Sequence, residues 1–240
     1  MHYIVLDFEW SQPLSEKEML MEPFPFDSEI IEIGAIKLDE SFQTVDEFKT
    51  FIRPQFYPHL SNAVVQLTKI RPQELEKAPS FPEAFDAFID WCGDDCALCS
   101  WGPDDIPVLL DNMLLHGIPT EPFPYCYDLQ RIFARELLRE NRQCSLSDAV
   151  KMLKLPADRA HDALNDTRNT VRVCERMDLA GCIDEYRTAF VGYGADRKSG
   201  LISGLIYPSL DAALADTRVK EITCPYCGEQ VSLTVSPQEG

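Results

Sequence analysis

The chain of 240 residues lacks several features that would place it in a simple class. It has no apolar run long enough to cross a bilayer, since a membrane-spanning helix needs about 20 predominantly apolar residues. Its N-terminus lacks the pattern of a secretory signal, and the sequence contains no internal repeat and no low-complexity run. These absences favour a globular cytoplasmic protein that does not contact a membrane.

Basic residues are also scarce, with 22 Lys and Arg against 40 Asp and Glu and a net charge of −18. This balance argues against a protein that coats nucleic acids generally. Cysteine, by contrast, occurs nine times. Cys92, Cys99 and Cys174 stand alone within apolar segments, which predicts reduced thiols in the core of a cytosolic protein. The length favours one large domain followed by a tail.

The alternation of apolar and polar residues predicts an α/β fold, because short strands alternate with helices after an initial run of strands. The two long strands expected at 29–38 and 44–53 can form an antiparallel pair. Strands are expected at 2–9, 29–38, 44–53, 96–101 and 124–128, and helices at 61–70, 81–92, 104–116, 129–140, 145–153 and 162–179.

Asp7 and Glu9 end an apolar run that reads as a buried strand. Their side chains project to the same face, because alternate residues of a strand share a side. Two neighbouring carboxylates raise each other's pKa unless a positive charge lies between them, and Mg²⁺ or Mn²⁺ prefers such oxygen ligands. Taken alone, the pair is more simply explained as two exposed acids at a strand end.

A second acidic group follows Trp101-Gly102-Pro103, where Asp104 and Asp105 open an expected helix. Helix capping and compensation of the helix dipole account for one acid at such a position. The other acid is left without a structural explanation.

A third group comprises His161 and Asp166. Asp162 is a suitable N-cap for the helix expected at 162–179, and it could also orient His161. His161 would then precede the helix, and Asp166 in its first turns would face the same cleft. A lone histidine is more often structural than catalytic, but two other unexplained acidic groups in the same chain favour a functional role.

These three groups follow the order and spacing of the DEDDh exonucleases, the DnaQ-like (exonuclease/RNase T) superfamily of 3′→5′ exonucleases. The similarity covers residues 2–180 and is greatest to the branch that contains the bacterial sporulation inhibitor KapD and the eukaryotic exonucleases that trim histone messenger and small interfering RNAs. The segments 29–38, 48–54, 60–61, 67–70, 78–81 and 127–130 also resemble the corresponding segments of the family.

The resemblance implies an RNase H-like fold, a mixed five-stranded sheet flanked by helices, in an exonuclease domain at 1–180. It implies 3′→5′ hydrolysis of single-stranded ends, RNA more than DNA, to nucleoside 5′-monophosphates. It assigns two Mg²⁺ or Mn²⁺ ions as cofactors and His161 as the general base. The metal ligands that it implies are Asp7, Glu9, Asp105 and Asp166; the family spacing after Trp-Gly selects Asp105 and leaves Asp104 as the cap.

Four further residues are candidates for substrate binding. Trp10 could stack on the terminal base, although an ideal strand would place it with Phe8 in the core. Leu67 and Thr68 belong to the segment that approaches the 3′-terminal nucleotide in relatives. Arg168 could contact a phosphate, or its helix face could simply be solvated and balanced by neighbouring acids.

The segment 181–240 is expected to be a C-terminal extension, with a helix near 208–216 and a possible role in binding a protein partner. Cys224 and Cys227 form a single Cys-x2-Cys-Gly knuckle. It could be half of a Zn²⁺ site completed by a distant residue or a second chain, and the alternative, slightly favoured, is a knuckle held by packing alone.

Two other functions remain open at this point. The chain could be a regulatory or interaction protein that keeps the exonuclease fold, which its acidity and its extension would suit. It could also hydrolyse very short oligonucleotides, for which a long basic track is unnecessary.

Overall fold

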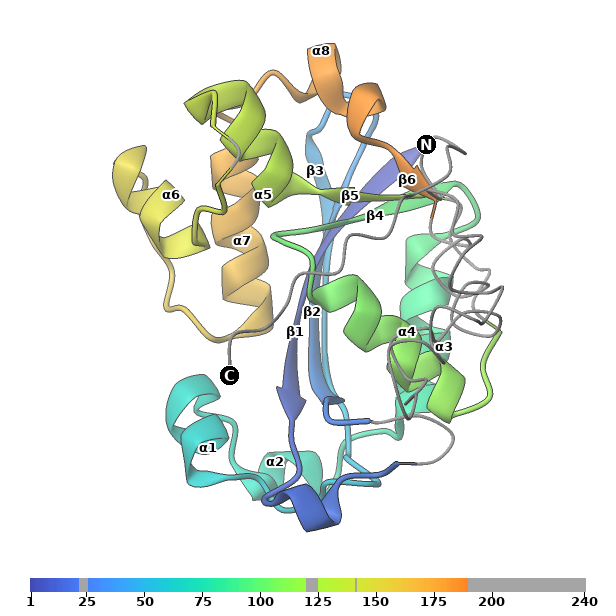
Figure 1. The fold of residues 1–240 in the computed structure, drawn as a ribbon. Coiled ribbons are helices and arrows are strands. Elements are labelled where there is room, and N and C mark those ends of the chain that lie inside the picture. The colour runs from blue at the N-terminus through green and yellow to red at the C-terminus, as the bar shows by residue number, and fades with distance from the viewer. Residues whose placement is uncertain (22–25, 120–124, 141, 190–240) are drawn as a thin grey trace, which may run out of the picture.

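The computed structural model describes residues 1–21, 26–119, 125–140 and 142–189. Within these residues one mixed sheet has six strands in the order β3-β2-β1-β4-β5-β6 (Figure 1). The predicted α/β class and the five predicted strands are confirmed, and a two-residue strand, β6, extends the sheet beyond β5. The strands are β1 (His2–Ser11), β2 (Glu29–Leu38), β3 (Thr44–Phe51), β4 (Cys96–Ser100), β5 (Tyr125–Asp128) and β6 (Thr188–Ala189).

Strand lengths differ at the centre of the sheet. β1 pairs antiparallel with β2 along nearly its whole length, and β2 pairs antiparallel with β3, as predicted for 29–38 and 44–53. On its other side β1 pairs in parallel with β4, but only through residues His2–Leu6. β4 in turn pairs in parallel with β5. From Asp7 onward, therefore, β1 extends past the end of its parallel neighbour.

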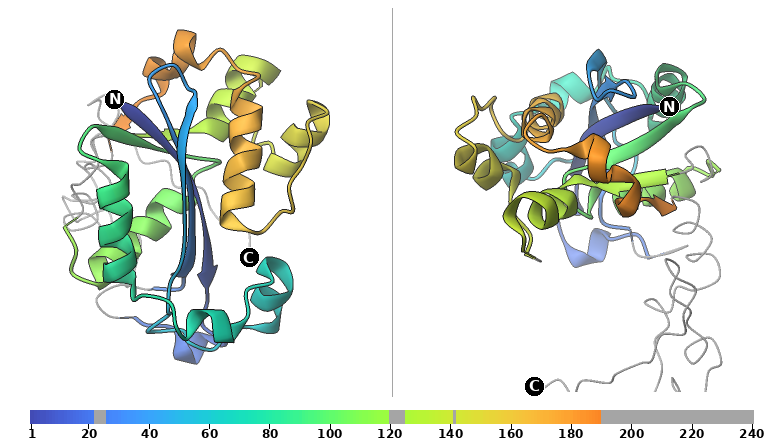
Figure 2. Two further views of the ribbon diagram at one scale, coloured as in Figure 1. Left: turned by 180° about the vertical axis from the view of Figure 1, so that it is seen from behind. Right: turned by 90° about the horizontal axis from the view of Figure 1, so that it is seen from above.

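Helices cover both faces of the sheet. α3 and α4 lie on one face and α5, α6 and α7 on the other, and the view from behind in Figure 2 agrees. α1 and α2 lie beyond the C-terminal end of β1 (Figure 1). In the described residues the α-helices are α1 (Asn62–Thr68), α2 (Pro72–Leu75), α3 (Phe81–Cys92), α4 (Asp105–Leu115), α5 (Leu129–Ile132), α6 (Leu146–Met152), α7 (Ala163–Cys174) and α8 (Leu179–Cys182).

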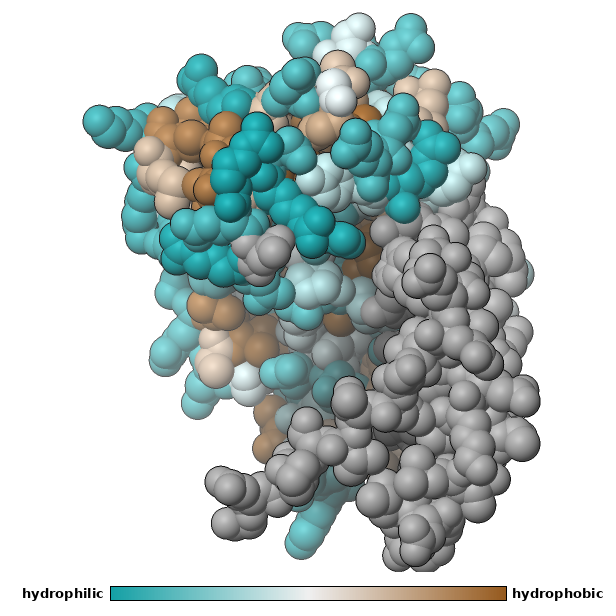
Figure 3. All heavy atoms as spheres, turned by 45° about the horizontal axis from the view of Figure 1, so that its top comes forward, coloured by the Kyte–Doolittle hydropathy of each residue, from teal (hydrophilic) through white to brown (hydrophobic). Residues whose placement is uncertain are grey.

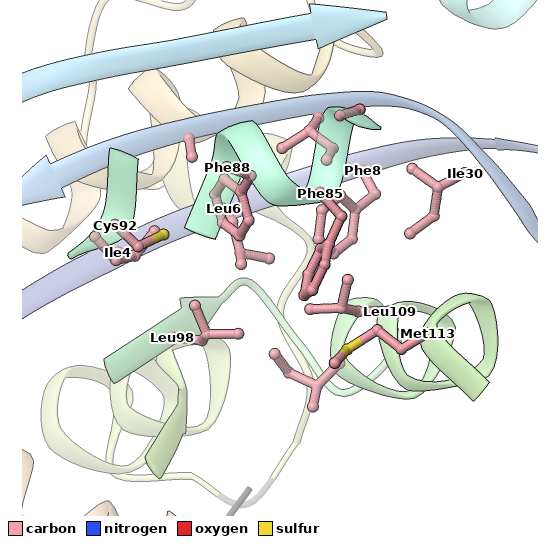
Figure 4. Close-up of a cluster of buried hydrophobic side chains, with 14 of the residues drawn as sticks. Ile4, Leu6, Phe8, Ile30, Phe85, Phe88, Cys92, Leu98, Leu109 and Met113 are labelled. Atoms are coloured by element: carbon pink, nitrogen blue, oxygen red, sulfur yellow. The ribbon is translucent and has the colours of Figure 1, made fainter. Parts of the chain in front are cut away.

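Two hydrophobic cores lie on opposite faces of β1, because successive side chains of a strand alternate between faces. Leu6 and Phe8 pack with Phe88 of α3 and Leu109 of α4, as Figure 4 shows. Val5 packs on the other face against helices α5 and α7. β1 is thus buried on both faces, as its unbroken apolar run predicted.

Gly34 allows α7 to approach β2 closely. A Cβ atom at Gly34 would lie 2.2 Å from the backbone carbon of Ala163 and 2.2 Å from the backbone nitrogen of Leu164. The Thr167 hydroxyl, one turn along α7, donates a hydrogen bond to the Gly34 carbonyl at 3.0 Å. Gly34 is also the register partner of Asp7 in β1. The first turn of α7 is therefore seated next to the strand position that carries Asp7.

Two predicted helices differ from the observed ones. The helix predicted at 162–179 ends at Cys174, and α8 begins after Asp178, whose side chain accepts a hydrogen bond from the Gly181 amide at 3.2 Å. The helix predicted at 129–140 consists of the short α5 followed by a π-helical turn at Phe133–Leu138. This turn ends at Arg139 with a positive φ of 59°.

The described chain continues past the predicted domain boundary at residue 180, through α8 to β6. That boundary stays a prediction, because the helix expected near 208–216, Cys224 and Cys227 lie outside the described residues. Cys92, Cys99 and Cys174 are buried free thiols, as predicted. A search of the described helices found none with the length and apolar character needed to cross a membrane.

Candidate active site

A pocket of about 440 Å³ lies where β1 extends past β4. We call it the site pocket. Its wall includes residues of β1, α1 and the starts of α4 and α6, together with the loop that precedes α7. The structure brings to it all five residues predicted for catalysis and metal binding, which are Asp7, Glu9, Asp105, His161 and Asp166.

Asp105 reaches the site pocket from the first residue of α4. Its Oδ1 accepts a hydrogen bond from the Phe8 backbone amide at 3.2 Å. Because β4 pairs only as far as Leu6, a helix carboxylate takes the place of a strand partner for this amide. The side chain is buried, with 6% of its surface exposed. The end of β4 therefore both opens the pocket and determines where Asp105 lies.

His161 and Asp166 reach the pocket from the N-terminal end of α7. The His161 backbone amide donates to Asp166 Oδ2 at 2.7 Å, and His161 adopts a φ of +61°, which is uncommon for a residue other than glycine. One ligand atom each of Glu9, His161 and Asp166 lies within 4.8 Å of the others. Asp162 caps α7 by accepting from the Asn165 amide at 3.2 Å, as predicted.

The carboxyl groups of the pocket oppose each other's ionisation. Burial is the largest cause of the raised pKa of Asp7, which lies well above its ordinary value, followed by the charges of Asp105, Glu9 and Asp166. The pKa of Glu9 rises to about 8, through burial first and then the charge of Glu32.

The other two carboxyl groups have hydrogen bonds that partly offset their burial. Burial raises the pKa of Asp105 to about 7, against the effect of the Phe8 amide. Burial also raises the pKa of Asp166, against the effect of the His161 amide. Among the described residues that line the pocket none is Lys or Arg. The four carboxyl groups offer oxygen ligands with no neighbouring Lys or Arg in the described pocket lining. Such a set fits hard divalent cations such as Mg²⁺.

Asp104 stands at the N-cap position of α4, but its side chain makes no capping hydrogen bond. Its predicted position is correct, whereas its predicted capping interaction is absent. Asp104 instead lines the site pocket beside Asp105.

Three of the four predicted substrate-binding residues line the pocket. Leu67 is 51% exposed there, and Thr68 is buried beside it. Trp10 lines the pocket and also packs against the core cluster that contains Phe8, and its stacking on a base stays a prediction. Arg168 does not line the pocket among the described residues, and its Nε donates to Glu47 Oε1 at 3.1 Å. The substrate role of Arg168 stays a prediction.

Glu32 and Lys49 were missed by the sequence reasoning. Glu32 is the register partner of Glu9 and is 1% exposed. Lys49 Nζ lies 2.5 Å from Glu32 Oε1 and 2.8 Å from Asp162 Oδ2. A charged residue inside the apolar run of β2 was a usable signal for Glu32, whereas Lys49 has no comparable signal.

A model of the exonuclease family, RNase T, matches residues 5–174. The chain belongs to this exonuclease family. The predicted family is therefore confirmed. The family consists of nucleases, which hydrolyse phosphodiester bonds, and divalent metal binding is typical of it.

Curated relatives share about a quarter to a third of their aligned residues with the chain. The 3′-5′ exoribonuclease 1 of Homo sapiens is 25% identical over 171 residues, which are 67% of this chain and 49% of the relative. The probable 3′-5′ exonuclease KapD of Bacillus subtilis is 25% identical over 123 residues, 51% of this chain and 56% of the relative. A PolC-type DNA polymerase III of Thermotoga maritima is 32% identical over 176 residues, 73% of this chain and 12% of the relative. The chain thus spans about half the length of the first two relatives and far less of the third.

A solved structure of the nuclease domain of 3′hExo, described as a DEDDh family member bound to rAMP, has the same fold. It superposes with a TM-score of 0.64 at 24% sequence identity, covering 75% of this chain and 93% of that domain. The predicted RNase H-like exonuclease fold is confirmed by this likeness.

Proposed function

We propose that this chain is a metal-dependent 3′→5′ exonuclease that removes nucleoside 5′-monophosphates from single-stranded ends, RNA in preference to DNA. The observation that carries the proposal is that four carboxyl groups and His161, from three distant parts of the sequence, line one pocket. Membership of the exonuclease family supports it. The relative named as an exoribonuclease supports RNA as the substrate. Because another relative is named as a DNA polymerase, DNA is the alternative substrate to compare.

Asp7, Glu9, Asp105 and Asp166 would hold two Mg²⁺ or Mn²⁺ ions in the pocket. Bound there, the ions would supply neutralisation of the phosphoryl oxygens and an acidified water. The raised pKa values of these carboxyl groups support the assignment, because burial opposes their ionisation and a bound cation would offset that effect.

His161 would act as the general base for the attacking water. Its exposed side chain lies within the 4.8 Å group formed with Glu9 and Asp166, and a ring nitrogen can accept a proton. In the reaction the water oxygen joins the phosphorus, and a ring nitrogen of His161 takes the water's proton. The bond from phosphorus to the 3′-oxygen of the penultimate nucleotide breaks, and that oxygen keeps the bonding electron pair and takes a proton from solvent water. Trp10 and Leu67 would contact the terminal base.

Digestion of matched RNA and DNA 20-mers tests the proposal. With Mg²⁺ or Mn²⁺ we expect release of nucleoside 5′-monophosphates, faster from RNA, and no release in EDTA. Asp7→Asn and His161→Ala should each lower the rate by about 100-fold or more, the scale of a lost general base. Lys37→Met is the matched control, because Lys37 Nζ contacts the Trp91 carbonyl away from the pocket. Full activity in Asp7→Asn would contradict the site assignment.

A second candidate substrate is a very short oligonucleotide, since three cations on neighbouring elements are already paired with acids. Lys49 binds Glu32 and Asp162, Arg159 binds Asp162, and Arg168 binds Glu47. Rates on 2-nucleotide and 20-nucleotide RNAs separate the candidates, because a long substrate gains nothing from an acidic surface. Metal binding with no turnover on either would instead favour a regulatory protein that keeps the fold.

A further inference from the structure

Three charged side chains form a connected group behind the loop that carries His161. Lys49 of β3 lies between Glu32 of β2 and Asp162, with Nζ to oxygen distances of 2.5 Å and 2.8 Å. The Glu32 side chain is 1% exposed, that of Asp162 18% and that of Lys49 30%. We call this group the Lys49 bridge. Lys49 itself does not line the site pocket.

Glu32 anchors the Lys49 bridge to strand β2. It lies in the central part of β2, directly opposite Glu9 of β1. Two acids at facing positions of neighbouring strands repel each other, and the ammonium of Lys49 supplies the opposite charge at 2.5 Å. Glu32 Oε2 also accepts from the Ala163 amide at 3.5 Å, at the first residue of α7. The buried acid is therefore held between a lysine and the start of a helix.

Asp162 connects the Lys49 bridge to His161. One oxygen of Asp162 caps α7 through the Asn165 amide, and the other binds Lys49. The preceding residue, His161, has a φ of +61°, a conformation that a non-glycine residue keeps only where its surroundings hold it. Its own amide is bound by Asp166. The backbone of His161 is thus restrained on one side by Asp166 and on the other by Asp162.

We propose that Lys49 is a positioning residue that joins Glu32 to Asp162 and so holds the His161 backbone, and with it the imidazole, at the site pocket. The inference rests on the proposed function through the role of His161. The fixed strands β2 and β3 would serve as the frame on which the loop is anchored.

Hydrogen exchange tests the positioning role without any need for activity. In metal-free protein, the amides of residues 161–166 should exchange roughly tenfold faster in Lys49→Met, because local opening no longer breaks an ion pair. Lys37→Met, which removes a lysine from the same sheet away from the pocket, should leave them unchanged. Unchanged exchange in Lys49→Met would overturn the proposal.

Steady-state kinetics separates positioning from substrate binding. Lys49→Met should lower kcat by about 10- to 100-fold while the KM for the oligonucleotide stays the same, and Lys49→Arg should restore most of the rate. Asp162→Asn keeps an oxygen that can cap α7 but loses the charge that binds Lys49, so it should show a loss smaller than that of Lys49→Met. A wild-type kcat in Asp162→Asn, or a change confined to KM in Lys49→Met, would contradict the mechanism.

A double variant tests whether Lys49 acts through His161. If it does, Lys49→Met combined with His161→Ala should be no slower than His161→Ala alone, because coupled residues are not additive. A multiplied loss would show a separate role and overturn the proposal. If the wild-type chain releases no nucleotide, the proposed function fails, and the exchange measurement still decides the role of Lys49.

Discussion

Leu67 is an apolar side chain that faces the site pocket and is half exposed. Its predicted contact with the terminal nucleotide would cover that surface, so Leu67→Ala should raise the KM of a 20-mer by about fivefold, from the apolar area that is no longer buried. Because the side chain is exposed, the stability of the fold should hardly change.

Met152→Ala is the control for Leu67→Ala. Met152 is 48% exposed and lies on α6, outside the residues that line the pocket. Initial rates give the KM of each variant, and thermal unfolding shows whether each variant is folded. An equal rise of KM in the two variants would remove Leu67 from the substrate contact.

The raised pKa values of Glu9 and Asp105, about 8 and about 7, predict how stability depends on pH. In the unfolded chain both groups lose their protons near pH 4, so between about pH 4 and 8 the folded state binds more protons. The free energy of unfolding of the metal-free protein should therefore fall as pH rises through this window. Urea unfolding in EDTA at pH 5.5 and 8.5 measures it.

Asp105→Asn provides the comparison for this pH dependence. The variant has no carboxyl group at that position, so its loss of stability between pH 5.5 and 8.5 should be smaller than that of the wild type. Addition of Mg²⁺ at pH 8.5 should restore stability to the wild type more than to the variant. If the free energy of unfolding depended on pH identically in the wild type and the variant, the pKa of Asp105 would not be raised in the folded state.

At the residue scale, the sequence revealed the acids of the pocket better than the residues around them. Asp7 and Glu9, which alone could be exposed acids at a strand end, were recognisable because two further acidic groups follow them in the sequence. Lys49 was not, because it lies on the largely exposed edge strand β3 and nothing local distinguishes it from Lys37. Its partner Asp162 is more than a hundred positions away, and only the tertiary fold brings the two together.

Elements were predicted more reliably than their ends. The bounds of β2 and α3 agree with the apolar patterns and, for α3, with an N-terminal cap in which the Ser80 amide and hydroxyl donate to the Glu83 carboxylate. The end of α7 at Cys174 was missed, because the apolar spacing continues to Leu179 although the chain turns between them. Spacing alone does not distinguish one long helix from two short ones.

Gly34 carries a prediction for the contact between α7 and β2. In Gly34→Ala the new Cβ would lie 2.2 Å from backbone atoms of α7, which cannot move aside as a side chain does. The free energy of unfolding should fall by about 2 kcal/mol or more, and the rate of nucleotide release should fall with it as His161 and Asp166 are displaced.

Gly117→Ala is the control for Gly34→Ala. Nothing lies within 4 Å of a Cβ at Gly117, and the cost is limited to its positive φ of 67°, about 1 kcal/mol. Its rate of release should remain that of the wild type. Equal stability losses, or an active Gly34→Ala, would contradict the close seating of α7.

The net charge of the whole molecule should affect the rate at which a long oligonucleotide associates with it. At −18 the chain repels a polyanion, and hydrophilic residues cover much of the described surface visible in Figure 3. Added salt screens that repulsion. With saturating Mg²⁺, kcat/KM for a 20-mer should therefore rise roughly threefold between 20 and 150 mM KCl.

A dinucleotide is the control for the effect of salt, because its small charge should make its kcat/KM nearly independent of KCl. A fall of kcat/KM with salt for the 20-mer would indicate instead that Lys and Arg side chains bind the phosphate backbone. Arg168 would then be the first residue to substitute.

The arrangement of the whole fold was predicted through the family resemblance rather than from apolar patterns. Patterns located the strands, but they contain no information on the order β3-β2-β1-β4-β5-β6. The two-residue β6 is too short to leave a pattern, and it lies past the predicted end of the domain. Local sequence therefore predicted the parts, and only the resemblance predicted how they join.

β1 is ten residues long and its parallel neighbour β4 only five. A continuous sheet separates the helices packed on its two faces, so their side chains cannot contact one another through it. Because β4 ends early, the sheet has a gap beside the C-terminal half of β1. At this gap an acid from α4 on one face and an acid from α7 on the other line the same pocket. A longer β4 would fill this gap and separate the acids of α4 and α7, although the acidic residues themselves would be unchanged.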